Sequence, residues 1–121
     1  MQVTGTFPEG IITENGRISR NFTLVEQLFR HTLEIAHDPD IDAEDVGDPV
    51  YYSACLLAKR ITIEGISKVL PAMILELSGL DGTELAKATF TLENQRANFR
   101  SAAEAAEKER AGAAETGAEP L

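Results

Sequence analysis

The stretch GIITENGRISRNFTL at residues 10–24 decides the first part of the fold. Asn15-Gly16 at its centre is the strongest short hairpin signal, because both residue types tolerate the positive φ angles of a type I′ turn. Such a turn places Glu14 opposite Arg17 as an oppositely charged cross-strand pair. We therefore predict two antiparallel strands joined at this turn.

The strand pattern extends on both sides of the turn. The two-residue period of a strand places Ile18 and Phe22 on one face of the second strand. Upstream, residues 2–7 are expected to extend the first strand as far as Pro8, which interrupts it because proline has no N–H to donate.

A helix is predicted directly after the hairpin. Thr23 and Glu26 have the spacing of a capping box, in which the threonine hydroxyl accepts a hydrogen bond from a backbone N–H of the first turn. The Asp38-Pro39 pair disfavours helix, so the helix is expected to end near His37. Its apolar face is predicted from residues at helical spacing, widened by Leu33 and Ile35: Val25, Leu28, Phe29, Thr32 and Ala36.

An acidic segment follows, with the sequence DPDIDAEDVGD at residues 38–48, six carboxylates and no basic residue. An EF-hand calcium loop that began at Asp38 would need glycine at its sixth position and glutamate at its twelfth. Those positions hold Ala43 and Pro49, so no calcium site is predicted. We interpret the segment as a solvated connector between helices.

Two further helices are predicted before residue 80. Asp48 and Pro49 form a helix start, an N-cap followed by proline at the first helical position. Residues 61–66 fit either a short strand or an extended connection. Pro71 opens a short helix for which Gly79 is the expected C-terminal cap. The buried face of the helix after Asp48 is predicted to hold Val50, Ala54, Leu57, Ala58 and Ile61, with Cys55 beside them.

The last helix is predicted to be long. Asp81 and Glu84 form a second capping box, and the helix is expected to run through at least Phe99. Apolar residues recur every seven positions with a second set between them, a pattern that resembles the seam of a coiled coil. The first set is Leu85, Leu92, Phe99 and Ala106, and the intermediate set is Ala88, Gln95 and Ala102.

The two ends of this helix are expected to differ in role. Packing on the domain itself is the favoured role of Leu85, Ala88 and Leu92. Phe99 and the alanine-rich extension lie beyond the compact part, where they fit either binding of a partner protein or self-association.

The predicted fold is α+β, with an N-terminal β-hairpin followed by about four helices, the last one long. Residues 1–110 are expected to form a single domain. Residues 111–121 consist mainly of small residues with glycine and proline, which leave little to bury, and they are predicted to be a disordered tail.

Residue types used in catalysis are few. His31 and His37 are six positions apart, so they do not share a helix face as a metal-binding pair four positions apart would. Cys55, the single cysteine, excludes an internal disulfide and is expected to pack as a small hydrophobe. The sequence contains no phosphate-binding loop and no nucleophile elbow. We therefore predict no enzyme activity, no metal and no cofactor.

The charge of the chain excludes some partners. Twenty acidic residues against eleven basic ones give a formal net charge of -9. Binding of DNA or RNA by phosphate neutralisation needs a basic surface, and so does adsorption to anionic membranes. No apolar run is long enough to span a bilayer, and residues 1–10 show no signal peptide. We expect a soluble cytoplasmic protein with neither nucleic-acid nor membrane partners.

The order of these motifs resembles a known family. NGRIS at residues 15–19 leads into FTL at 22–24, and LLAKRI at 56–61 is followed by EGI at 64–66 and MILELSGLDGTEL at 73–85. These stretches resemble the tail assembly chaperones of Mu-like, contractile-tailed phages and prophages, over roughly residues 10 to 95.

The resemblance implies a phage morphogenesis factor in the host cytoplasm. Proteins of this family are thought to coat the helical tape-measure protein, to help tail-tube subunits polymerise around it, and to leave before the tail matures. The interface residues that we predict are Tyr51, Leu92 and Phe99. The alternative function is a small structural tail or baseplate component that remains in the virion.

Overall fold

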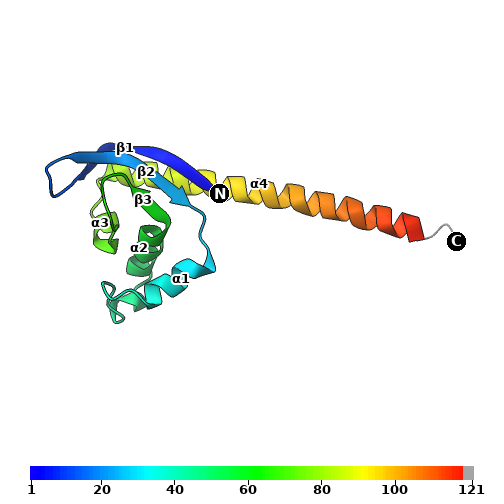
Figure 1. Cartoon of the computed structure of the whole chain (residues 1–121), viewed down its shortest axis with the longest axis horizontal. Coiled ribbons are helices and arrows are strands. Elements are labelled where there is room, and N and C mark those ends of the chain that lie inside the picture. Colours follow the sequence, from blue (N-terminus) through cyan, green and yellow to red (C-terminus); the bar gives the residue numbers. More distant parts are fainter. Residues whose placement is uncertain (119–121) are drawn as a thin grey trace.

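The computed structural model describes the backbone of residues 1–118 and the side chains of residues 1–112 (Figure 1). It confirms the predicted α+β class, with an N-terminal hairpin and a long last helix. The elements in chain order are β1 (Gln2–Ile12), β2 (Ile18–Val25), α1 (Phe29–Ala36), the 3-10 helix η1 (Asp45–Gly47), α2 (Pro49–Arg60), β3 (Ile61–Ile63), α3 (Pro71–Leu75) and α4 (Gly79–Ala118). None of the described helices is both long enough and apolar enough to cross a membrane.

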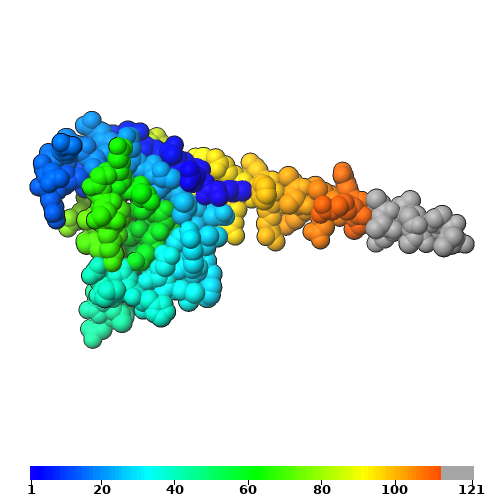
Figure 2. Space-filling view, viewed as in Figure 1, coloured from blue at the N-terminus to red at the C-terminus, as the bar shows by residue number. Residues whose placement is uncertain are grey.

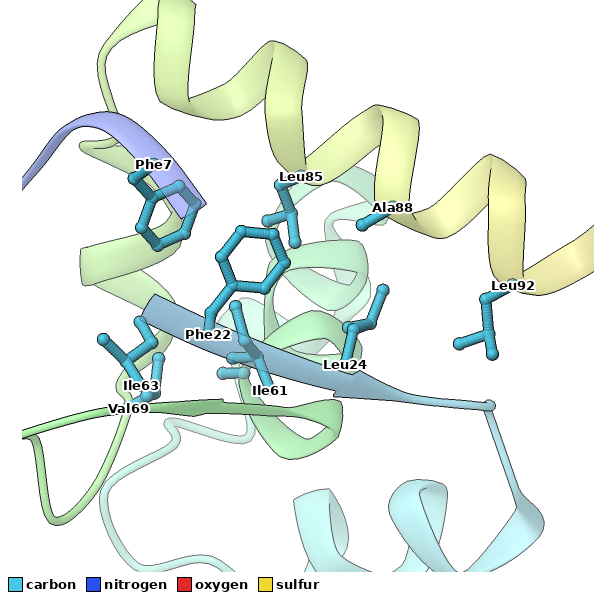
Figure 3. Packing of buried hydrophobic residues seen from close by; sticks show 10 residues of the cluster. Phe7, Phe22, Leu24, Ile61, Ile63, Val69, Leu85, Ala88 and Leu92 are labelled. Atoms are coloured by element: carbon cyan, nitrogen blue, oxygen red, sulfur yellow. The ribbon is translucent and has the colours of Figure 1, made fainter. Parts of the chain in front are cut away.

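The three strands form one antiparallel sheet in the order β1-β2-β3. One face of the sheet is apolar and packs against α2 and α4, while Thr4, Thr6 and Thr62 are exposed. Figure 3 shows Leu85 and Ala88 of α4 pointing toward the strands. Residues 61–66 were predicted to be either a short strand or an extended connection. The structure shows a short strand, β3, followed by a turn.

The hairpin turn differs from the predicted type I′ turn. Ile12 pairs with Ile18, and the N–H of Thr13 donates to the carbonyl of Arg17 at 2.8 Å, so the loop has three residues instead of two. Arg17 therefore faces Thr13, and the predicted pairing with Glu14 is wrong. Gly16 has a φ of 76°, and no non-glycine residue in the described chain has a positive φ. The reason is steric: a three-residue loop needs one left-handed residue, which glycine supplies, whereas a type I′ turn needs two.

A wide bulge lets β1 continue past Pro8, where we expected the strand to stop. Thr6 pairs with Asn21 and Ile11 pairs with Ser19, so four residues of β1, at positions 7–10, lie opposite a single residue of β2. The proline therefore lies where the ladder is already interrupted, and its missing N–H costs no ladder hydrogen bond.

The carboxylate of Asp81 ties this bulge to the start of α4. It accepts hydrogen bonds from the N–H groups of Glu9 at 2.9 Å and Gly10 at 3.0 Å. The predicted cap at Asp81 is therefore wrong: the hydroxyl of Ser78 accepts the N–H of Asp81 at 3.2 Å, and α4 begins at Gly79. Gly79 opens this helix instead of closing the one before it.

The first helix begins later than predicted. β2 continues through Val25 because Thr23 pairs with Thr62 of β3, and this long-range pairing overrides the local capping signal. Helix α1 begins at Phe29, whose side chain is 75% exposed. The helix buries Ile35, a predicted member of its apolar face, together with His31, whereas Leu28, Phe29 and Ala36 of that face are exposed. The predicted face is therefore confirmed at Ile35 and wrong at the exposed positions.

The acidic connector is partly buried. The side chain of Asp38 is 4% exposed and pairs with the ammonium groups of Lys59 and Lys68. The remaining carboxylates of the connector are exposed, as a solvated segment requires. The N-cap at Asp48 is confirmed, because its carboxylate accepts the N–H of Val50 at 2.9 Å. Val50 itself is exposed, in contrast to the predicted buried position.

Helix α4 has a packed part and a projecting part. Its packed face ends at Leu92, and every described side chain from residue 93 to residue 111 is exposed. Figure 2 shows this segment projecting from the rest of the described chain, while Arg96 near its start lies 3.8 Å from Glu26. We call residues 93–111 the projecting segment. Helix α4 continues through Ala111 and Gly112, where the disordered tail was predicted to begin, and residues 119–121 lie outside the described residues.

Candidate functional site

An open groove of about 500 Å³ runs between α2 and α4. Most of its lining surface is apolar, and the apolar part comes from Leu56, Leu57, Ala86 and Phe90. Phe90 is 65% exposed, which is unusual for so large an apolar side chain. We call this feature the α2–α4 groove and define it by Ser53, Leu56, Leu57 and Arg60 from α2 and by Ala86, Thr89, Phe90 and Glu93 from α4.

The two walls of the groove have the same spacing. Counted from Ser53, the residues of α2 lie three, four and seven positions further on, and the residues of α4 follow the same steps from Ala86. Residues at these intervals form one continuous stripe along a helix. Each helix therefore presents one stripe of side chains to the groove, against which a partner helix can lay its own apolar side chains.

Charged side chains close one end of the groove. Arg60 is largely buried, and its Nε donates to the carbonyl of Val25 at 3.0 Å. Burial lowers the pKa of Arg60, while the nearby carboxylate of Glu93 opposes that shift. Beyond this point Glu26 lies 3.8 Å from Arg96. A polypeptide segment bound in the groove would therefore contact an apolar floor and, at one end, polar groups with charges of both signs.

The predicted interface residues have three different environments. Leu92 is 1% exposed and belongs to the main core, so its side chain is not available to a partner and this assignment is corrected. Tyr51 is half-buried beside the smaller cluster formed around Cys55. Phe99 is 67% exposed on the projecting segment. Their exposure thus leaves Phe99 as the accessible member of the set.

The sequence reasoning missed Phe90 and the leucines of α2. A signal for Phe90 was present, because it lies off the seven-residue series of Leu85, Leu92 and Phe99. An aromatic residue on the other side of an amphipathic helix indicates a second contact surface. Leu56 carried no such signal, because which apolar residue of α2 borders a groove depends on where α4 packs.

The histidines and the cysteine considered for chemistry differ in burial. The thiol of Cys55 is fully buried, and burial raises its pKa. His31 is buried and His37 is exposed. Burial lowers the pKa of His31, whose Nδ1 accepts the N–H of Leu28 at 2.9 Å. Within the described residues, no three histidine, cysteine or acidic side chains are grouped so as to hold a metal ion.

Comparisons with known proteins add no relative. Searches against protein-family models, curated proteins and solved structures returned no match. The proposed function is therefore based on the geometry of the groove and the projecting segment.

Proposed function

We propose that this chain is a tail assembly chaperone that binds a helical segment of a partner protein in the α2–α4 groove. The partner is the tape-measure protein of a contractile phage tail, and the binding takes place in the host cytoplasm and assists tail-tube assembly. The observation that supports this most is the exposed apolar surface of the groove, which includes Phe90 and suits the apolar face of a helix as ligand. The sequence motifs that resemble this chaperone family support the choice of partner.

The surface around the groove suits reversible binding. The groove is open and its apolar part comes from four side chains, so a bound helix keeps one side in solvent. An affinity based on so small an area stays moderate, as a chaperone that is later released requires. The net charge of -9 favours solubility and opposes aggregation of the free chaperone.

The proposal is tested by the substitution Phe90→Asp. The chain is co-expressed with the tape-measure protein, and the amount of partner that co-purifies is measured. The substitution places a charge on the groove floor, so we expect at least a tenfold loss of captured partner, about the effect of losing one anchor residue. Far-UV circular dichroism should be unchanged, because Phe90 is mostly exposed.

The matched control is Phe29→Asp, which makes the same change at an exposed phenylalanine on α1. This variant should capture the partner as well as the unchanged chain does. Equal capture by the Phe90 variant, or a loss with the Phe29 variant alone, would contradict the groove assignment. Mass spectrometry of mature particles separates the chaperone from a structural tail component, because only the structural component stays in the particle.

A further inference from the structure

We propose that α1 is an acid-sensitive element of the fold, which separates from α2 when the ring of His31 takes up a proton. This device is independent of the proposed function, because it concerns how α1 is held and not what the α2–α4 groove binds. Of the eight residues of α1, only His31 and Ile35 are buried. The docking of the helix therefore depends on two side chains, one of which belongs to the residue type that titrates near neutral pH.

The ring of His31 is placed so that its neutral form fits. The side chain is 1% exposed, and Nδ1 accepts a hydrogen bond from the N–H of Leu28 at 2.9 Å. This bond closes the start of α1, as the third side chain of a helix does in a capping box. A nitrogen that accepts carries no hydrogen, so the neutral ring has its proton on Nε2. Protonation adds a hydrogen to Nδ1 that points at another N–H, and the bond is lost.

The surroundings of His31 also disfavour a positive charge. Burial is the largest cause of its lowered pKa; Arg30 of α1 and Arg60 of α2 act in the same direction, and the carboxylate of Glu34 opposes them. Glu34 is exposed, so water and salt weaken its effect. The ring also lies in the first turn of α1, where the helix dipole is unfavourable for a cation. A protonated ring is therefore unstable in this position.

The carboxylates of the neighbouring segments act on other cations. Glu26, which precedes α1, lies 3.8 Å from Arg96 of α4. Glu93 of α4 raises the pKa of Arg60, whose Nε is bonded to the backbone carbonyl of Val25. Neither carboxylate therefore replaces Glu34 as a partner for a protonated His31.

Separation of α1 would be a local event. Ile35 of α1 packs with Ile41 and Cys55 in the smaller core cluster, whereas no residue of α1 belongs to the main core between the sheet and α4. A helix of this length is not stable by itself in water, so α1 should unfold once it leaves α2. The sheet should keep its structure, because its buried contacts do not involve α1.

The experiment measures hydrogen–deuterium exchange of the full chain by mass spectrometry, with rates corrected for the intrinsic effect of pH. The open form of α1 binds a proton with an ordinary histidine pKa of about 6.5, above that of the closed form, so α1 loses stability as the pH falls. Between about pH 7.5 and about pH 5, the protection of the α1 amides should fall about tenfold, while that of the β2 amides should stay constant. Asp38 remains mostly ionised at about pH 5 even in an unfolded chain, so its ion pairs do not contribute to this change.

His31→Gln tests the residue directly. The amide oxygen of glutamine can accept the N–H of Leu28 but does not titrate, so protection of α1 in this variant should be the same at both pH values. The matched control is His37→Gln, which changes the exposed histidine directly after α1 and should keep the tenfold fall.

Three results would overturn the proposal. The first is an unchanged chain whose α1 amides are equally protected at both pH values. The second is an equal loss of protection in β2, which would show global unfolding instead of release of α1. The third is a His31→Gln variant that responds to pH as the unchanged chain does.

Discussion

Two glycines of the hairpin have positive φ angles but different surroundings. Gly10 has a φ of 88° and Gly16 a φ of 76°, so any other residue is strained at either position. A Cβ at Gly10 would lie 2.6 Å from Ile18 and 2.9 Å from a backbone carbonyl, whereas a Cβ at Gly16 would meet no atom within 4 Å. Both positions therefore favour glycine because of their positive φ angle, but only Gly10, in the bulge, also lacks space for a Cβ.

Alanine substitutions separate these two requirements. Gly16→Ala should lower the free energy of unfolding by about 1 kcal/mol, the usual cost of a left-handed non-glycine residue. Gly10→Ala should cost at least about 2 kcal/mol, because the bulge must also move to admit the methyl group. Urea denaturation of both variants measures the difference, and equal losses would mean that the bulge adapts without strain.

At the level of elements, the acidic connector is fixed to the domain by one carboxylate. Asp38 contacts Lys59 of α2 and Lys68 of the segment before α3. The hydrogen bonds from these two ammonium groups, the largest causes, hold the pKa of Asp38 well below its usual range. A connector that looks purely solvated in the sequence therefore joins two distant segments.

The lowered pKa predicts how stability depends on pH. The unfolded chain takes up a proton at the usual aspartate pKa near 4, while the folded chain keeps Asp38 ionised to lower pH. The contribution of Asp38 is therefore complete above about pH 5 and is lost as the pH falls below about 4. Urea denaturation should show Asp38→Asn less stable by about 1–2 kcal/mol at pH 7.

This difference between the unchanged chain and the Asp38→Asn variant should shrink by pH 3. Asp42→Asn, which changes an exposed carboxylate of the same connector, serves as the control and should alter the stability little at either pH. A difference for Asp38→Asn that stayed constant from pH 7 to pH 3 would show that the ion pairs do not stabilise the fold.

On the scale of the whole molecule, α4 is both part of the core and a projecting arm. Leu85, Ala88 and Leu92 point into the core with Phe22 and Leu24, as Figure 3 shows. Seven residues beyond Leu92, Phe99 repeats the same helical position without any domain beneath it. The same seven-residue repeat thus places Leu92 in the core and Phe99 in solvent.

Alanine substitutions at Leu92 and Phe99 should affect the stability of the domain to very different degrees. Leu92→Ala should destabilise the domain by about 2–5 kcal/mol in urea denaturation, because it leaves a cavity in the core. Phe99→Ala should change the stability of the domain by less than about 0.5 kcal/mol, because its side chain is 67% exposed. A large loss of domain stability with Phe99→Ala would mean that the projecting segment supports the fold.

The sequence by itself determined the class and order of the elements. Asn15-Gly16, Asp48-Pro49 and Pro71 placed the hairpin, the start of α2 and the start of α3, because turns and helix starts depend on backbone preferences of adjacent residues. The seven-residue repeat likewise predicted a long last helix.

The tertiary structure decided the features that local sequence signals predicted wrongly or did not predict, such as helix starts, caps and the groove. Pairing of β2 with β3 overrode the capping box at Thr23, and Asp81 bonds a bulge instead of its own helix end. The α2–α4 groove likewise brings Leu57 and Phe90, which are far apart in the chain, to one surface. These features join residues far apart in the chain, so their energies depend on packing that no local pattern specifies.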